Sequence, residues 1–127
     1  MFIKQGLFIT AMVPKGRTII GLIEEIEIIG ADGKTRKIKA RIDTGATRSS
    51  VDQAIAKELG LGPVIRTKVV KQAHGHTTRP IVLVEFTLVG IKHKEEFTIA
   101  DRGHMKYGVL IGQNALKNGY LIDPNKR

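Results

Sequence analysis

The residues best placed to do chemistry in this sequence are those of Asp43-Thr44-Gly45-Ala46. They follow a β-branched stretch typical of a strand, and small polar residues come next. An aspartate that ends a strand often only caps a turn, and a glycine often only permits one. Taken alone, the tetrapeptide fits either a structural turn or a carboxylate held for general acid–base catalysis.

A second element far downstream, Val109-Leu110-Ile111-Gly112-Gln113-Asn114-Ala115-Leu116, strengthens the catalytic interpretation. The two elements, in this order and with a hairpin pattern between them, resemble the retropepsin-like aspartic peptidases. In that family an Asp-Thr-Gly-Ala loop is braced by an apolar-apolar-Gly segment that leads into a short helix. The resemblance implies an all-β fold, a closed acid-protease barrel with one or two short helices that works as a homodimer.

Four spaced blocks extend the likeness over most of the chain from Thr18 onward, and we interpret residues 18–127 as the retropepsin-like domain. The blocks are Thr18–Glu24, Lys39–Ala46, Asp101–Gly112 and Leu121–Pro124. They look like the bacterial and archaeal family known as ATP-dependent zinc proteases, whose members often accompany ATP-grasp peptide ligases, so the likeness implies such a ligase as a partner. However, the sequence holds no His-Glu-x-x-His and no Walker-type glycine loop, and we expect neither a metal nor another cofactor.

Catalysis by this route needs two carboxylates close enough to share one proton, because two like charges at that distance cannot both ionise. The chain contains one Asp-Thr-Gly, so we expect a symmetric homodimer with one Asp43 from each subunit. Gly45 permits a tight turn and can donate its N–H to the carboxylate. The resemblance implies that the Thr44 hydroxyl interlocks with the loop of the partner subunit.

Substrate contacts are expected on both sides of this loop. The hairpin tip His74-Gly75-His76 corresponds to a flap that closes over a bound peptide. Ala46 and Arg48 follow the catalytic residues and approach the groove in this alignment, and the cation of Arg48 favours a peptide or protein substrate with acidic side chains. Viral retropepsins usually carry an acidic residue and an arginine where this chain has Thr47 and Gln113, so a neutral contact is expected here.

Composition limits the alternatives. The 127 residues form one domain's length of chain, with 42% hydrophobic residues, no cysteine, and 21 Lys and Arg against 12 Asp and Glu, a formal net charge of +9. The absence of cysteine excludes disulfide scaffolds and makes the cytoplasm the default compartment. No apolar run is long enough to span a membrane. The apolar stretch at residues 7–13 lacks a basic leader and a cleavage site, so residues 1–17 are interpreted as an N-terminal extension or edge strand, with Met12 as an alternative start.

Three rival functions remain open. A catalytically silent module with the same fold could bind acidic peptides or a ligase partner. A metal-dependent hydrolase could use His74 and His76, although paired imidazoles at a hairpin tip are more often solvent-exposed. A nucleic-acid partner could contact the basic row of residues 34–41. However, the alternation of Lys37, Lys39 and Arg41 is typical of a solvated strand face, aromatics make up only 5% of the chain and no binding motif interleaves them, so we do not expect this partner.

The elements that must position these residues are mostly strands. Residues 18–29 are predicted as one strand with Leu22, Ile26 and Ile28 on its apolar face, and Asp32-Gly33 as the turn to a return strand over residues 37–42. A helix is predicted over residues 52–60, capped by Ser50 or Asp52 and ended by Gly60. Further strands are expected over residues 64–73, 78–89, 91–100, 108–112 and 120–122, a helical turn over 113–117, and a plain turn at His104.

Overall fold

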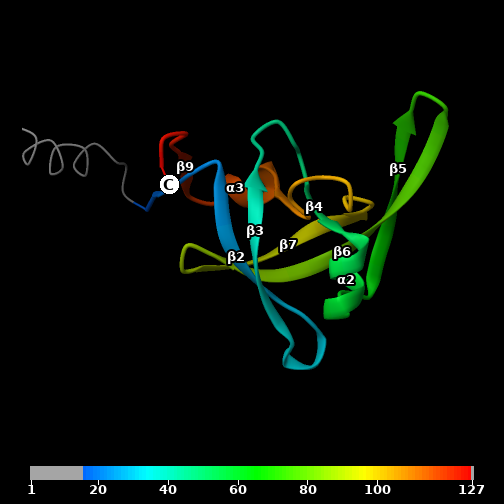
Figure 1. Cartoon of the computed structure of the whole chain (residues 1–127), viewed down its shortest axis with the longest axis horizontal. Coiled ribbons are helices and arrows are strands. Elements are labelled where there is room, and N and C mark those ends of the chain that lie inside the picture. Colours follow the sequence, from blue (N-terminus) through cyan, green and yellow to red (C-terminus); the bar gives the residue numbers. More distant parts are fainter. Residues whose placement is uncertain (1–15, 127) are drawn as a thin grey trace, which may run out of the picture.

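The computed structural model describes residues 16–126 as strands with two short helices (Figure 1). In chain order the elements are β1 (Thr18–Ile20), β2 (Ile23–Ile29), the 3-10 turn η1 (Ala31–Gly33), β3 (Thr35–Ile42), β4 (Ser49–Asp52), α2 (Gln53–Leu59), β5 (Val64–Gln72), β6 (Gly75–Leu88), β7 (Ile91–Ala100), β8 (Val109–Ile111), α3 (Gln113–Leu116) and β9 (Tyr120–Ile122). None of the helices in this part of the chain has the length and apolar character needed to span a bilayer.

Six strands close into a barrel. The sheet runs in the order β2-β3-β8-β4-β7-β6, and a further antiparallel pairing of β2 with β6 joins its two edges. β5 continues the sheet beyond the closed part and pairs with β6 along the hairpin. The expected all-β barrel with few helices is therefore confirmed. Closure pairs the two edges of the six-strand sheet with each other, whereas β5 keeps an unpaired outer edge among the described strands.

The hairpin of β2 and β3 shows how the alternating pattern builds the wall. Asp32 and Gly33 both adopt positive φ, 56° and 74°, as the tight turn between two twisted strands requires. Ala40 and Ile42 of β3 point into the core, while Lys37 and Lys39 face outward opposite Glu27 and Glu25. The prediction that this basic row is exposed to solvent is confirmed for these two lysines.

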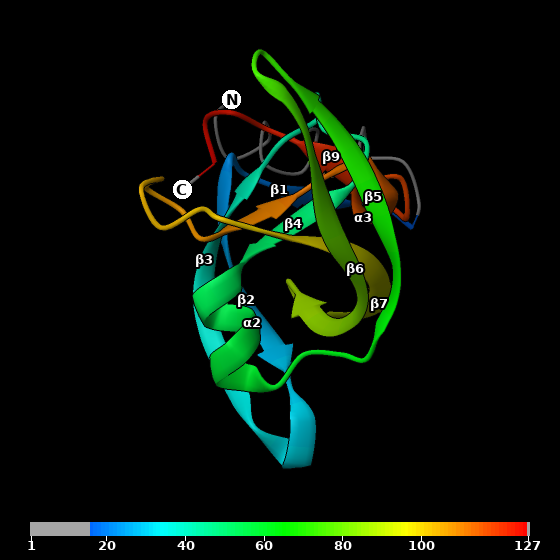
Figure 2. The ribbon, with the colours of Figure 1, turned by 90° about the vertical axis from the view of Figure 1, so that its right-hand side faces the viewer.

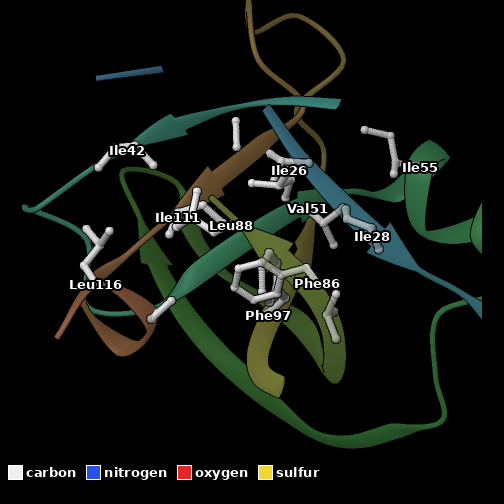
Figure 3. Packing of buried hydrophobic residues seen from close by; sticks show 14 of the residues in the cluster. Ile26, Ile28, Ile42, Val51, Ile55, Phe86, Leu88, Phe97, Ile111 and Leu116 are labelled. Atoms are coloured by element: carbon white, nitrogen blue, oxygen red, sulfur yellow. The ribbon is translucent and has the colours of Figure 1, made fainter. Parts of the chain in front are cut away.

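The core inside the barrel is built from the inward side chains of its strands (Figure 3). Phe86 of β6 and Phe97 of β7 meet edge to face at its centre, with ring centroids 5.4 Å apart. Ile26 and Ile28 pack there as predicted, but Leu22 is 48% exposed. It lies outside the strand because the stretch expected as one strand over residues 18–29 is broken into β1 and β2.

The break sends β1 into a separate two-stranded sheet. There it pairs in parallel with β9, so the first and last strands of the described chain lie side by side. β9 is fixed to the barrel by Tyr120, whose hydroxyl donates to the Leu88 carbonyl at 3.0 Å and lies 2.5 Å from Nε2 of His93. Burial raises the pKa of Tyr120 to about 12 and lowers the pKa of His93 below its ordinary value.

Helix α2 has the ends that the sequence predicts. Asp52 is its N-cap and accepts a hydrogen bond from the Ala54 N–H at 3.1 Å, and Gly60 ends it in the left-handed conformation. Ser50 is not the cap, because the helix starts at Gln53 and the residue directly before it is Asp52. The four-residue strand β4 was not predicted; all four residues are buried, so no polar alternation marks it.

Candidate active site

Asp43 lies in the loop between β3 and β4, at the carboxyl end of a barrel strand. Its backbone N–H donates to the Ile111 carbonyl of β8 at 2.9 Å, which fixes the start of the loop to the barrel wall. The Gly45 N–H donates to the Asp43 carboxylate at 2.9 Å, as predicted. The side chain is only half-buried. A carboxylate held by a backbone donor and partly open to solvent can accept a proton from a bound water.

Gly112 braces this loop from behind by a close approach that leaves no room for a side chain. A Cβ at this position would lie 2.7 Å from the Arg48 carbonyl oxygen and 2.8 Å from that of Ala46. The N–H of Gly112 donates to the buried Ser49 hydroxyl at 3.0 Å, and the Gln113 N–H donates to the Ala46 carbonyl at 2.8 Å. The downstream glycine segment is thus a close support for the Asp43 loop.

A neutral contact stands where viral retropepsins carry an ion pair. Nε2 of Gln113 donates to the Thr44 carbonyl at 2.7 Å, and the Asn114 N–H donates to the Thr47 carbonyl at 3.1 Å. Both bonds join α3 to the Asp43 loop without a charge. The expectation of a neutral replacement is confirmed for Gln113, although its partner is the backbone of Thr44 rather than the Thr47 side chain.

The hairpin of β5 and β6 projects on the same side of the barrel as the Asp43 loop (Figures 1 and 2). A cavity of about 440 Å³ lies between the hairpin and this loop, and Ala46 and Arg48 line it on the loop side. Five cations border the cavity, and no carboxylate is among the described residues that line it. The cations are Arg48, Lys68, Lys71, Arg79 and Arg102. This groove therefore carries a strong positive potential.

A smaller cavity of about 130 Å³ adjoins Asp43 itself, and Arg41 and Arg102 line it. Arg102 is held by its backbone N–H, which donates to the Asp52 carboxylate at 2.7 Å, and by Nε, which donates to the Tyr107 carbonyl. Burial, with further contributions from neighbouring cations led by Arg41, lowers the pKa of Arg102, while Asp52 and Asp43 oppose that shift.

Sequence reasoning missed both arginines. Arg41 was assigned to the solvated row of β3; it is exposed, but it also lines the cavity beside Asp43. Arg102 lies outside every predicted element. No local pattern marks its position, because the contact that places it is long-range: one carboxylate oxygen of Asp52 caps α2 and the other accepts from the Arg102 N–H.

The predicted flap residues lie at the free end of the hairpin. His74 is in the two-residue turn, and Gly75 and His76 begin β6, with Gly75 at φ 119°. Both histidines are exposed. In the described part of the chain, no group of three or more His, Cys, Asp or Glu residues is placed to hold a metal ion. His104 lies in an exposed turn, as predicted.

Solved structures with this architecture include viral proteases and a protein of unknown function. The chain is similar to the simian foamy virus (mac) protease, with 25% identity and a TM-score of 0.58 over 75% of this chain and 91% of that one. It is also similar to EIAV protease bound to an inhibitor, with 18% identity and a TM-score of 0.57 over 76% of this chain and 85% of that one. A Legionella pneumophila protein of unknown function is similar too, with 16% identity and a TM-score of 0.58 over 86% of this chain and 94% of that one. These likenesses show that the chain has the fold of the retropepsin-like barrels.

The family follows from the sequence itself. The family described as RimB-like, retropepsin-like aspartic endopeptidase RimB, matches residues 52–127, which is more than half of the chain. The chain belongs to this family. The matched region contains Gly112 and Arg102 but begins after the Asp43 loop. No curated protein matches the sequence.

Proposed function

We propose that the protein is an aspartic endopeptidase that acts as a homodimer, with Asp43 of each subunit contributing one carboxylate. The observation that carries the proposal is the Asp43 loop: the Asp43 carboxylate accepts the Gly45 N–H, Asp43 lines the smaller cavity of about 130 Å³, and Gly112 braces the loop. A single Asp-Thr-Gly per chain makes the site incomplete without a second copy.

In this mechanism the two carboxylates share one proton and titrate as a pair. The ionised member takes a proton from the lytic water, which attacks the peptide carbonyl, while the protonated member donates its proton to the carbonyl oxygen. The tetrahedral intermediate then collapses, and the proton moves to the leaving amine. Thr44, which the resemblance assigns to the contact between the two loops, would keep the carboxylates in register.

The substrate class that we propose is a peptide with acidic side chains. The five cations around the groove support it, and they include Arg48, which the sequence already placed there. A positive groove raises both the encounter rate and the affinity for anionic chains. An ATP-grasp ligase that adds acidic residues to protein tails is the proposed partner, on the family resemblance alone, and the cysteine-free composition makes the cytoplasm the proposed compartment.

The matched test is Asp43→Asn against Asp32→Asn. Both substitutions remove one carboxylate, but Asp32 lies in the distant β2–β3 turn. Asp43→Asn should abolish cleavage of an acidic peptide while the circular dichroism spectrum and melting temperature stay unchanged, and Asp32→Asn should retain activity. Full cleavage by Asp43→Asn would exclude the shared-proton mechanism.

Two further outcomes separate the alternatives. A chelator should leave cleavage unchanged; inhibition that zinc reverses would instead favour a metal-dependent hydrolase and the zinc-protease interpretation of the family. If the wild type binds acidic peptides and cleaves none between about pH 4 and 8, the range over which carboxylate pairs and histidines titrate, the silent binding module becomes the better account.

A further inference from the structure

One carboxylate of this chain is held between two arginines, one of which, Arg48, also lines the groove. Nη1 of Arg66, on β5, donates to Oε2 of Glu96 on β7 at 2.8 Å, and Nη2 of Arg66 contacts Oε1. Nε of Arg48 lies 3.7 Å from the same Oε1. A bidentate guanidinium–carboxylate contact of this kind suits any carboxylate, whichever chain supplies it.

The contact joins the hairpin to the loop that follows Asp43. β5 pairs with β6 and with no other described strand, so the Arg66–Glu96 bridge ties this outer strand to β7 across β6. The backbone of Glu96 is fixed separately, because its carbonyl accepts from Nδ2 of Asn114 at 2.8 Å. The side chain of Glu96 can therefore move away without loss of the strand.

The three side chains are open to solvent. Their exposed fractions are 26% for Arg48, 50% for Arg66 and 30% for Glu96, and a second cavity of about 440 Å³ adjoins Arg48 and Glu96. Two cations share one carboxylate, so the cluster keeps a net positive charge and attracts a further anion. Exposed ion pairs add little net stability, so an incoming carboxylate can exchange with Glu96 at small cost. The hydrogen bond from Arg66 is the main cause that lowers the pKa of Glu96, so Glu96 is ionised near neutral pH.

We propose that Arg48 and Arg66 form a carboxylate-binding site that Glu96 occupies in the free protein. A carboxylate of a bound acidic peptide replaces Glu96 there, and the replacement removes the side-chain bridge that ties the outer strand β5 to β7. Glu96 is thus an internal competitor that occupies this carboxylate-binding site until an acidic ligand arrives. The inference rests on the proposed acidic-peptide function, but it concerns binding and does not need turnover.

The test compares Glu96→Gln with Glu95→Gln, each in an Asp43→Asn background that prevents cleavage. Both substitutions remove one negative charge from β7, but Glu95 contacts Asn118 and neither arginine. Binding of tetraglutamate is measured by titration calorimetry at low ionic strength. Glu96→Gln should bind roughly fivefold tighter than Glu95→Gln, because the loss of an exposed ion pair frees both guanidinium groups. Adding Arg66→Gln to Glu96→Gln should remove this gain.

Hydrogen exchange gives a second readout that needs no ligand. The amides of β5 should exchange faster in Glu96→Gln than in Glu95→Gln, because only the former loses the bridge across β6. Equal or weaker tetraglutamate binding by Glu96→Gln, or β5 exchange equal in the two variants, would overturn the proposal. Peptide binding that follows the expected order without any cleavage by the wild type would instead sustain it and reject the endopeptidase.

Discussion

The close approach of Gly112 to the Asp43 loop gives the sharpest test of how the site is built. In Gly112→Ala the new Cβ would meet the carbonyl groups of Arg48 and Ala46 at 2.7–2.8 Å, and these are backbone atoms that cannot rotate away. Relief requires the loop to move outward by several tenths of an ångström. That shift strains the 2.8 Å bond from Gln113 to Ala46 and the 3.1 Å bond from Asn114 to Thr47.

The expected cost of Gly112→Ala is large for a single methyl group. Overpacking of this kind costs about 1–3 kcal/mol, and each weakened hydrogen bond adds up to about 1 kcal/mol. The free energy of unfolding should therefore fall by about 3 kcal/mol, which corresponds to a melting temperature about 10 °C lower for a domain of this size. Urea denaturation and a thermal melt measure both quantities, and peptide cleavage should fall with them.

Gly103→Ala is the matched control, because its Cβ would meet only the Asp101 carboxylate at 3.6 Å, an ordinary contact. Both substitutions stiffen the unfolded chain equally. If Gly112→Ala were as stable as Gly103→Ala to within about 0.5 kcal/mol, the loop would not depend on this approach and the account of its bracing would be wrong.

Two further predictions concern buried polar groups. Burial lowers the pKa of His93 below its ordinary value of 6.5, so the unfolded chain binds more protons and the free energy of unfolding falls as the pH drops below about 6.5. His93→Gln should flatten this part of the stability–pH profile, and His104→Gln, at an exposed histidine, should not. A profile that keeps its slope in His93→Gln would show that His93 is not the cause of this pH dependence. Ser49→Ala removes the acceptor of the Gly112 N–H and should cost about 1–3 kcal/mol in urea denaturation, so a cost near zero would show that this N–H finds another partner.

Local sequence patterns predicted the parts of the fold that depend on neighbouring residues. The alternation along β3 and the Asp32-Gly33 turn define a hairpin, and the cap at Asp52 and stop at Gly60 define α2. Each signal lies within a few residues of the element that it specifies. The contact of Gly45 with Asp43 was predictable for the same reason.

The features that were missed depend on contacts between distant parts of the chain. The break between β1 and β2 follows from the parallel pairing of β1 with β9, which lie at opposite ends of the described chain. β4 is too short and too uniformly buried to show a period. Arg102 reaches the Asp43 cavity only because Asp52 holds its backbone, a contact between residues fifty positions apart. Such placements are set by the closed barrel and have no local sequence signature.

A subunit-mixing experiment tests the central claim most directly. Wild type and a threefold excess of Asp43→Asn are unfolded together, refolded, and assayed for cleavage per wild-type chain. If each active site needs one Asp43 from each of two subunits, random pairing should leave about a quarter of the wild-type activity per chain, because the mixed dimers hold one carboxylate. Activity per wild-type chain that is unchanged by the excess variant would show that a single copy suffices, and the shared-carboxylate account would be contradicted.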